Sequence, residues 1–107
     1  MKVKIPPKIK VSIGDYEIFY QPHLSIDESQ CGQVWFRKNL IRIDPCFPAN
    51  EQFVTLIHEV LHIVDRFYKC HLEEDNVDRI ARGISEFLVN NLGIEYDWSD
   101  IREIKEE

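Results

Sequence analysis

Apolar and polar residues alternate along the first part of the chain with the two-residue period of β-strands. Residues 8–13 alternate in this way, and residues 16–20 resume the pattern after Gly14-Asp15. Two such strands around a Gly-Asp pair are typical of a β-hairpin. Residues 32–36 and 40–44 indicate two further strands. The pattern therefore predicts a small sheet of three or four strands, mainly antiparallel.

The apolar spacing then changes to that of α-helices, after an aperiodic stretch at residues 22–30 that we expect to be a loop. One helix is predicted from about residue 51 to 67 or 68, with Asn50 as its N-cap. A second begins at residues 73–75, where carboxylates suit the helix dipole, and ends at Gly93. The apolar residues expected to face the core are Phe53, Ile57, Val60, Val64 and Phe67, then Val77, Ile80, Ala81, Ile84, Phe87 and Leu88. The fold class is α+β: a sheet followed by two packed helices.

Composition narrows the class of protein. A chain of 107 residues with 44% hydrophobic and 30% charged residues is typical of one globular domain. We expect a domain over residues 1–93 and a C-terminal tail over residues 94–107. The net charge of −6 argues against nucleic acid as a partner. No apolar run approaches a membrane span, so a cytoplasmic location is expected. The cysteines Cys31, Cys46 and Cys70 are odd in number and are expected to be buried free thiols.

The first predicted helix carries the sequence His58-Glu59-Val60-Leu61-His62. Residues four apart lie one above the other on a helix, so His58 and His62 project side by side and can bind one Zn²⁺. Glu59 lies about 100° further round, where it can reach a metal-bound water as a general base. The alternative is a helix with two partly buried histidines and a surface glutamate.

A zinc site of this kind needs a third protein ligand, and the start of the second helix offers candidates. Glu73 and Glu74 open that helix, and His71 precedes it. Asp78 follows Glu74 by four residues, so it can support a zinc-bound imidazole from one turn behind. We assign Glu74 as the ligand and Asp78 as its support, with Glu73 and His71 as the remaining alternatives.

A His-Glu-x-x-His helix followed by Glu-x-x-x-Asp on the next helix resembles the gluzincin zinc metallopeptidases. In its small size and its sheet before two helices, the chain is most similar to the minigluzincins of thermophilic prokaryotes. It also resembles the catalytic core of phage- and mobile-element-encoded peptidases that cleave repressors. The similarity covers residues 33 to about 92. It implies a zinc metalloendopeptidase that hydrolyses peptide bonds through a water activated by Glu59.

The resemblance also implies how substrate binds and how activity is restrained. An edge strand containing Gln33, Val34 and Trp35 would pair with an extended substrate. The C-terminal segment would keep the enzyme latent, as in a zymogen. In that arrangement the tail residues Tyr96 and Trp98 fill subsites while Asp97 or Asp100 approaches the metal. Without such a role, the segment is an acidic, frayed terminus; its last part, from Ser99, is expected to form one or two helical turns.

Other parts of the mechanism stay open. The donors near enough to assist at the oxyanion are Tyr68 and His71. The expected partner is a peptide or an unstructured protein, and the oligomeric state is undetermined. The alternative function is a non-hydrolytic regulatory or interaction module stabilised by zinc. Glu59 favours the enzyme, because a closed structural zinc site has no use for a carboxylate beside an open coordination position.

Overall fold

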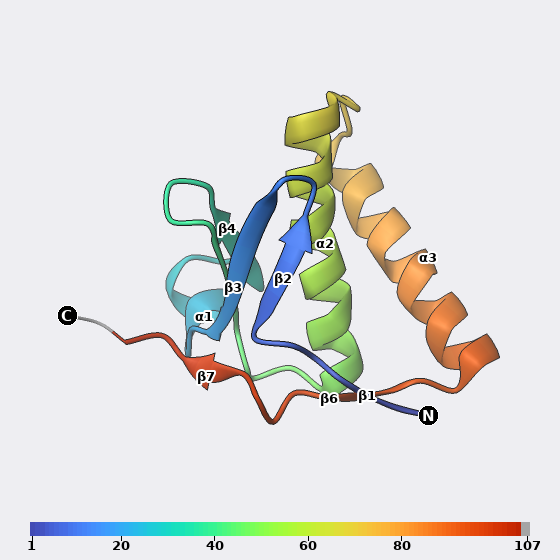
Figure 1. Ribbon diagram of the computed structural model, residues 1–107. Coiled ribbons are helices and arrows are strands. Elements are labelled where there is room, and N and C mark those ends of the chain that lie inside the picture. Colours follow the sequence, from blue (N-terminus) through green and yellow to red (C-terminus); the bar gives the residue numbers. More distant parts are fainter. Residues whose placement is uncertain (106–107) are drawn as a thin grey trace.

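The computed structural model describes residues 1–105 and consists of a sheet packed on the first of two long helices, with the second helix packed on the first (Figure 1). The α+β class, with a sheet followed by two packed helices, is confirmed. In chain order the elements are β1 (Lys2–Lys4), β2 (Lys8–Val11), β3 (Gly14–Tyr20), α1 (Leu24–Asp27), β4 (Gly32–Trp35), β5 (Leu40–Ile43), α2 (Ala49–Tyr68), α3 (Glu74–Leu92), β6 (Glu95–Asp97) and β7 (Arg102–Glu103).

The main sheet has the order β2-β3-β5-β4, and short β7 pairs with β3 as a fifth strand. The pairs β2–β3 and β4–β5 are antiparallel, whereas β3–β5 and β3–β7 are parallel. The parallel share is larger than predicted, because the chain passes through α1 to the outer strand β4 before it returns as β5. Strand β4 is consequently an edge strand of the sheet, and it contacts α2.

Two local predictions in this region are corrected. The β2–β3 turn is formed by Ser12 and Ile13 rather than by Gly14-Asp15, since Gly14 already pairs with Val11. Ser12 takes the left-handed conformation that the turn requires, with φ of 57°. The stretch expected to be a loop contains α1, which places Leu24 in the interior.

Helix α2 lies between the sheet and α3 (Figure 1). Its buried line toward the sheet is Gln52, Leu56, Glu59 and Ile63, at helical spacing. The predicted line through Phe53, Ile57, Val60, Val64 and Phe67 is only half-buried, and Phe67 is exposed. The helix begins at Ala49 with Pro48 at the N-cap position, so the predicted Asn50 cap is wrong.

Helix α3 packs against α2 through a narrower face than the apolar pattern predicts. Val77, Ala81 and Ser85 are buried in that contact. Ile80, Ile84 and Phe87 were expected in the core but are exposed, because they lie on the flank of α3 that no other described element covers. Gly93 ends the helix in the left-handed conformation, as predicted.

The C-terminal segment forms part of the core. Strand β6 pairs in parallel with β1, and β7 pairs with β3, so the helical turns expected after Ser99 are wrong. Tyr96 stacks on Phe53 with ring centroids 3.9 Å apart, and the Trp98 indole N–H donates to the Ala49 carbonyl oxygen at 3.1 Å. The buried core cluster is Ile5, Tyr16, Ile18, Ile41, Ile43, Leu56, Ile63, Tyr96, Trp98 and Ile101.

Two remaining expectations concern the cysteines and membrane insertion. Cys31, Cys46 and Cys70 are exposed free thiols, so the prediction that they are buried is wrong. Across residues 1–105, neither long helix is apolar enough over a sufficient length to span a bilayer.

Candidate metal centre and its cleft

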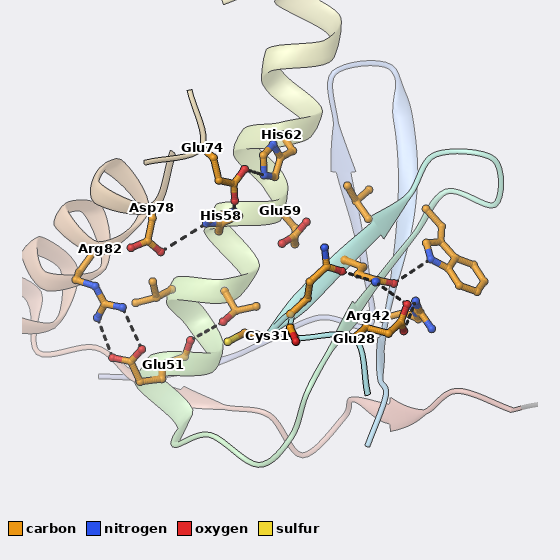
Figure 2. A pocket seen from close by; sticks show the side chains of 18 residues that line it. Glu28, Cys31, Arg42, Glu51, His58, Glu59, His62, Glu74, Asp78 and Arg82 are labelled. Atoms are coloured by element: carbon orange, nitrogen blue, oxygen red, sulfur yellow. Dashed lines mark hydrogen bonds and ion pairs between the residues drawn. The ribbon is translucent and has the colours of Figure 1, made fainter. Parts of the chain in front are cut away.

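Three side chains from the two long helices converge at one point (Figure 2). His58 and His62 project from successive turns of α2, with ring centroids 4.8 Å apart. Glu74, the first residue of α3, lies across both rings. Its Oε1 is 2.6 Å from His58 Nε2, and its Oε2 is 3.1 Å from His62 Nε2. The predicted triad is therefore assembled by the fold.

The short connection between α2 and α3 fixes this geometry. Helix α2 ends at Tyr68. Its C-cap residue Lys69 has a left-handed backbone with φ of 53°, and His71 also has positive φ at 56°. The Asp65 carboxylate accepts a hydrogen bond from the Leu72 backbone N–H at 3.1 Å. Glu73 is then the extended N-cap residue, and α3 begins with Glu74 facing the histidines. Of the three candidates for the third ligand, the structure brings Glu74 to the pair.

The donor set fits a divalent metal ion. One ligand atom from each of His58, His62 and Glu74 can be chosen so that all lie within 4.8 Å of one another. Two imidazole nitrogens and one carboxylate oxygen are ligands that Zn²⁺ accepts in catalytic sites. The side chains are 16%, 30% and 67% exposed, respectively, so an ion could reach them from the cleft.

Asp78 lies one turn behind Glu74, as predicted. Its Oδ1 is 3.6 Å from His58 Nδ1, the ring nitrogen opposite the one that faces Glu74. A carboxylate in this position favours the tautomer in which Nδ1 carries the proton and Nε2 is free to bind a metal.

Glu59 is buried between α2 and β4, at 6% exposure. Burial raises the pKa of its carboxyl group to about 7; the nearby His58 charge opposes this rise and the Glu74 charge adds to it. A carboxyl group with this pKa exchanges protons readily near neutral pH.

The approach of β4 to Glu59 depends on Gly32. A Cβ atom at Gly32 would lie 2.5 Å from Thr55 Cγ2, 3.1 Å from the Arg42 carbonyl oxygen and 3.5 Å from Glu59 Cγ. These contacts leave no room for a larger residue, so a glycine here allows the edge strand to pass beside the buried carboxyl group.

A cavity of about 880 Å³ contains the metal-ligand group, Glu59 and the edge strand. The predicted edge-strand residues Gln33, Val34 and Trp35 line it. Val34 packs toward the core. Gln33 and Trp35 lie on the other side of the strand, where the Trp35 indole N–H donates to Gln33 Oε1 at 3.2 Å. The edge strand and the metal-ligand group thus share one cleft.

The cleft also has charged walls that the sequence analysis did not identify. Arg82 on α3 forms a two-pronged ion pair with Glu51 on α2, at 2.9 and 3.3 Å. The Arg42 guanidinium lies 4.0 Å over the Trp35 ring and pairs with Glu28 at 3.4 Å. The spacing of Glu74, Asp78 and Arg82 on α3 was the signal for Arg82, since residues four apart share one helix face.

The other predicted site residues lie elsewhere. Tyr68 and His71 are exposed and do not line the cleft, so the geometry gives no support to either as an oxyanion donor. The tail residues do not reach it either. Tyr96 and Trp98 are buried in the core, Asp97 accepts a hydrogen bond from the Ser99 backbone N–H, and Asp100 pairs with Lys4. The expected contact of the tail with the metal is corrected, because strand pairing holds this segment beside β1 and β3.

Comparison of the chain with protein-family models, with curated proteins and with solved structures gives no match in any of the three.

Proposed function

We propose that this chain is a zinc-dependent metallopeptidase that acts on peptides or unstructured proteins in the cytoplasm. The observation that carries the proposal is the meeting of three components in one cleft. These are a metal-ligand group (His58, His62, Glu74), a buried carboxyl group with its pKa near 7 (Glu59), and a sheet edge (β4). Each is common alone, but a peptidase needs all three together.

His58, His62 and Glu74 would hold the ion, and Asp78 would hold the His58 ring in the required tautomer. A bound zinc ion supplies Lewis acidity, which polarises a peptide carbonyl and makes water a stronger acid. Because a nearby cation favours the carboxylate form, we expect the pKa of Glu59 to be lower in the zinc-loaded protein than about 7.

Glu59 would accept the proton of the attacking water at its carboxylate and later deliver it to the leaving nitrogen. Because the Glu59 carboxyl group is buried, bulk water would have little access to the proton that it carries. Gly32 keeps β4 close enough that a substrate on the strand lies next to this carboxyl group.

The substrate would bind along β4 as an added strand. The strand pairs on one side with β5 and has no strand partner on its other side among the described elements. Only an extended backbone can make such contacts, so an unstructured segment is preferred over a folded one.

Zinc content and proteolysis of the same preparations test the proposal. The wild-type chain should bind one Zn²⁺ by elemental analysis, and His62→Ala should lose it. Glu59→Gln should keep the metal while cleavage of fluorescently labelled casein falls about 10³-fold, the size expected for loss of a general base. Glu73→Gln, one residue before the proposed ligand, serves as the matched control and should change neither quantity.

The possible results separate the two functions under consideration. If Glu59→Gln retains full cleavage, the general-base role is refuted. If the wild-type chain binds zinc without cleaving any unstructured protein offered, the regulatory or interaction module becomes the better account.

A further inference from the structure

The two flanks of α3 differ in chemistry. Glu74, Asp78 and Arg82 recur every four residues on the flank that lines the cleft. Ile80, Ile84 and Phe87 lie on the opposite flank, at 40%, 41% and 59% exposure. Helix α3 forms the outer layer of the molecule, and no other described element covers this flank (Figure 1). We refer to Ile80, Gly83, Ile84 and Phe87 as the outer stripe.

Gly83 lies in the middle of the outer stripe and has no role within the chain. A Cβ atom built on it would meet nothing within 4 Å, and its φ is not in the left-handed region. Glycine in a helix interior costs about 1 kcal/mol relative to alanine. A glycine that destabilises the helix without an internal reason fits the close approach of a backbone from outside.

The outer stripe is self-complementary. About the midpoint between Gly83 and Ile84, Ile80 and Phe87 are equidistant, and so are Asn76 and Asn91. If a second α3 packs antiparallel across a two-fold axis at this midpoint, Ile80 meets Phe87 of the second copy. Gly83 then meets Ile84 of the second copy, so a small residue faces a large one at the centre.

The charges beside the stripe fit the same arrangement. Arg79 and Glu86 lie on one side of it. Among residues 1–105 neither forms a direct ion pair, although Glu86 is close enough to Arg82, one turn before it on α3, for the two charges to interact. Arg79 and Glu86 are about 10 Å apart along their own helix, too far to pair with each other. In an antiparallel pair of helices about this midpoint, Arg79 lies about 3 Å along the helix axis from Glu86 of the second copy, within reach of its long side chain, and symmetry gives this contact twice. A parallel pair would place like charges opposite each other.

We infer that the outer stripe of α3 is a homodimer interface, in which two copies of this chain pack their α3 helices antiparallel about Gly83 and Ile84. The flank that lines the cleft points away from this contact. Both clefts therefore stay open in the dimer. The inference is independent of catalysis, since none of the stripe residues belongs to the metal-ligand group.

Sedimentation of the full-length chain across the micromolar range tests the interface. The wild type should be dimeric, and Ile84→Glu should raise the dissociation constant about 30-fold or more, as for loss of a central apolar contact. Ile13→Glu is the matched control, because Ile13 is 86% exposed in the β2–β3 turn and should not affect the dimer. A wild type that is monomeric throughout, or a dimer unaffected by Ile84→Glu, would overturn the inference.

Charge reversal tests the orientation. Arg79→Glu and Glu86→Arg should each raise the dissociation constant about tenfold, because each creates two repulsive contacts. The double variant should return to the wild-type value, since the pairs re-form with exchanged signs. A double variant no tighter than the single ones rules out the antiparallel arrangement. Circular dichroism should be unchanged in all three variants, which separates loss of the dimer from loss of the fold.

Discussion

The N-terminal end of α2 and its middle differ in the burial and polarity of the side chains around them. At the N-terminal end, Trp98 and Tyr96 are buried, and the Trp98 indole N–H donates to the Ala49 carbonyl oxygen. In the middle, His58 and His62 are partly exposed and face the mostly exposed carboxylate of Glu74. One region closes the core, and the other presents polar groups to a cleft.

This difference indicates that stability and chemistry are separated along a single helix. Burial of large aromatic side chains stabilises the fold by several kcal/mol each. Partly exposed ion pairs contribute little, at most about 1 kcal/mol. Burial of the Glu59 carboxyl group opposes its ionisation, which raises its pKa. We therefore expect changes at the N-terminal end of α2 to unfold the protein and changes in the cleft to alter its chemistry.

The largest expected effect is from deletion of residues 94–107. The deletion removes Tyr96, Trp98 and Ile101 from the core. Each large buried side chain contributes about 3–5 kcal/mol. The summed loss is therefore comparable to the whole free energy of unfolding of a typical domain. The truncated chain should lack a cooperative thermal transition and native near-ultraviolet circular dichroism.

Glu74→Gln provides the contrast from the cleft. It should unfold within about 1 kcal/mol of the wild type when both are metal-free, because the side chain is mostly exposed. A truncated chain that folds and cleaves faster than the full-length chain would contradict the structural role of the segment and would restore the inhibitory-tail hypothesis.

The part of the site that could be predicted from the sequence is the part set by helix geometry. His58 and His62 are four residues apart, and so are Glu74 and Asp78, so two antiparallel helices bring these pairs together once the connection is short. Strand β4 could also be placed at the cleft from its pattern together with the family resemblance. The histidine pair and the carboxylate pair each depend only on spacing within one helix.

What could not be predicted depends on contacts between distant parts of the chain. Strands β6 and β7 have three and two residues, too few for any period, and form only because β1 and β3 offer edges. The apolar period of α3 likewise could not show that Ile80, Ile84 and Phe87 are exposed. A stripe that faces a core and a stripe that faces another molecule have the same spacing.

Gly32→Ala tests the boundary between the cleft and the core. The new methyl group would lie 2.5 Å from Thr55 Cγ2 and 3.1 Å from the Arg42 carbonyl oxygen, so β4 must move away from α2. Overpacking of this kind should reduce the free energy of unfolding by about 3 kcal/mol. Denaturant unfolding of dilute protein measures the effect.

Gly83→Ala is the matched control for this substitution. A Cβ atom at Gly83 meets nothing within 4 Å, and Ala is the better helix former, so the variant should be more stable by up to about 1 kcal/mol. If the two alanine variants shift stability equally, the close approach of β4 to α2 is not what requires Gly32.

A smaller effect than that of Gly32→Ala is expected where Asp44 links the end of β5 to α1. Burial tends to raise the pKa of its carboxyl group, but hydrogen bonds from the Ser25 and Cys46 backbone N–H groups outweigh this and lower it from 3.8 to about 2. Because the folded-state pKa is depressed, this contribution is present above about pH 4 and is lost as the pH falls toward 2. The shift corresponds to about 2 kcal/mol. Asp44→Asn should therefore be less stable than the wild type by this amount at pH 6, and most of the difference should be lost by about pH 2, where Asp44 is half protonated in the folded protein. A difference that is constant over this range would mean that the carboxylate charge does not stabilise the link between β5 and α1.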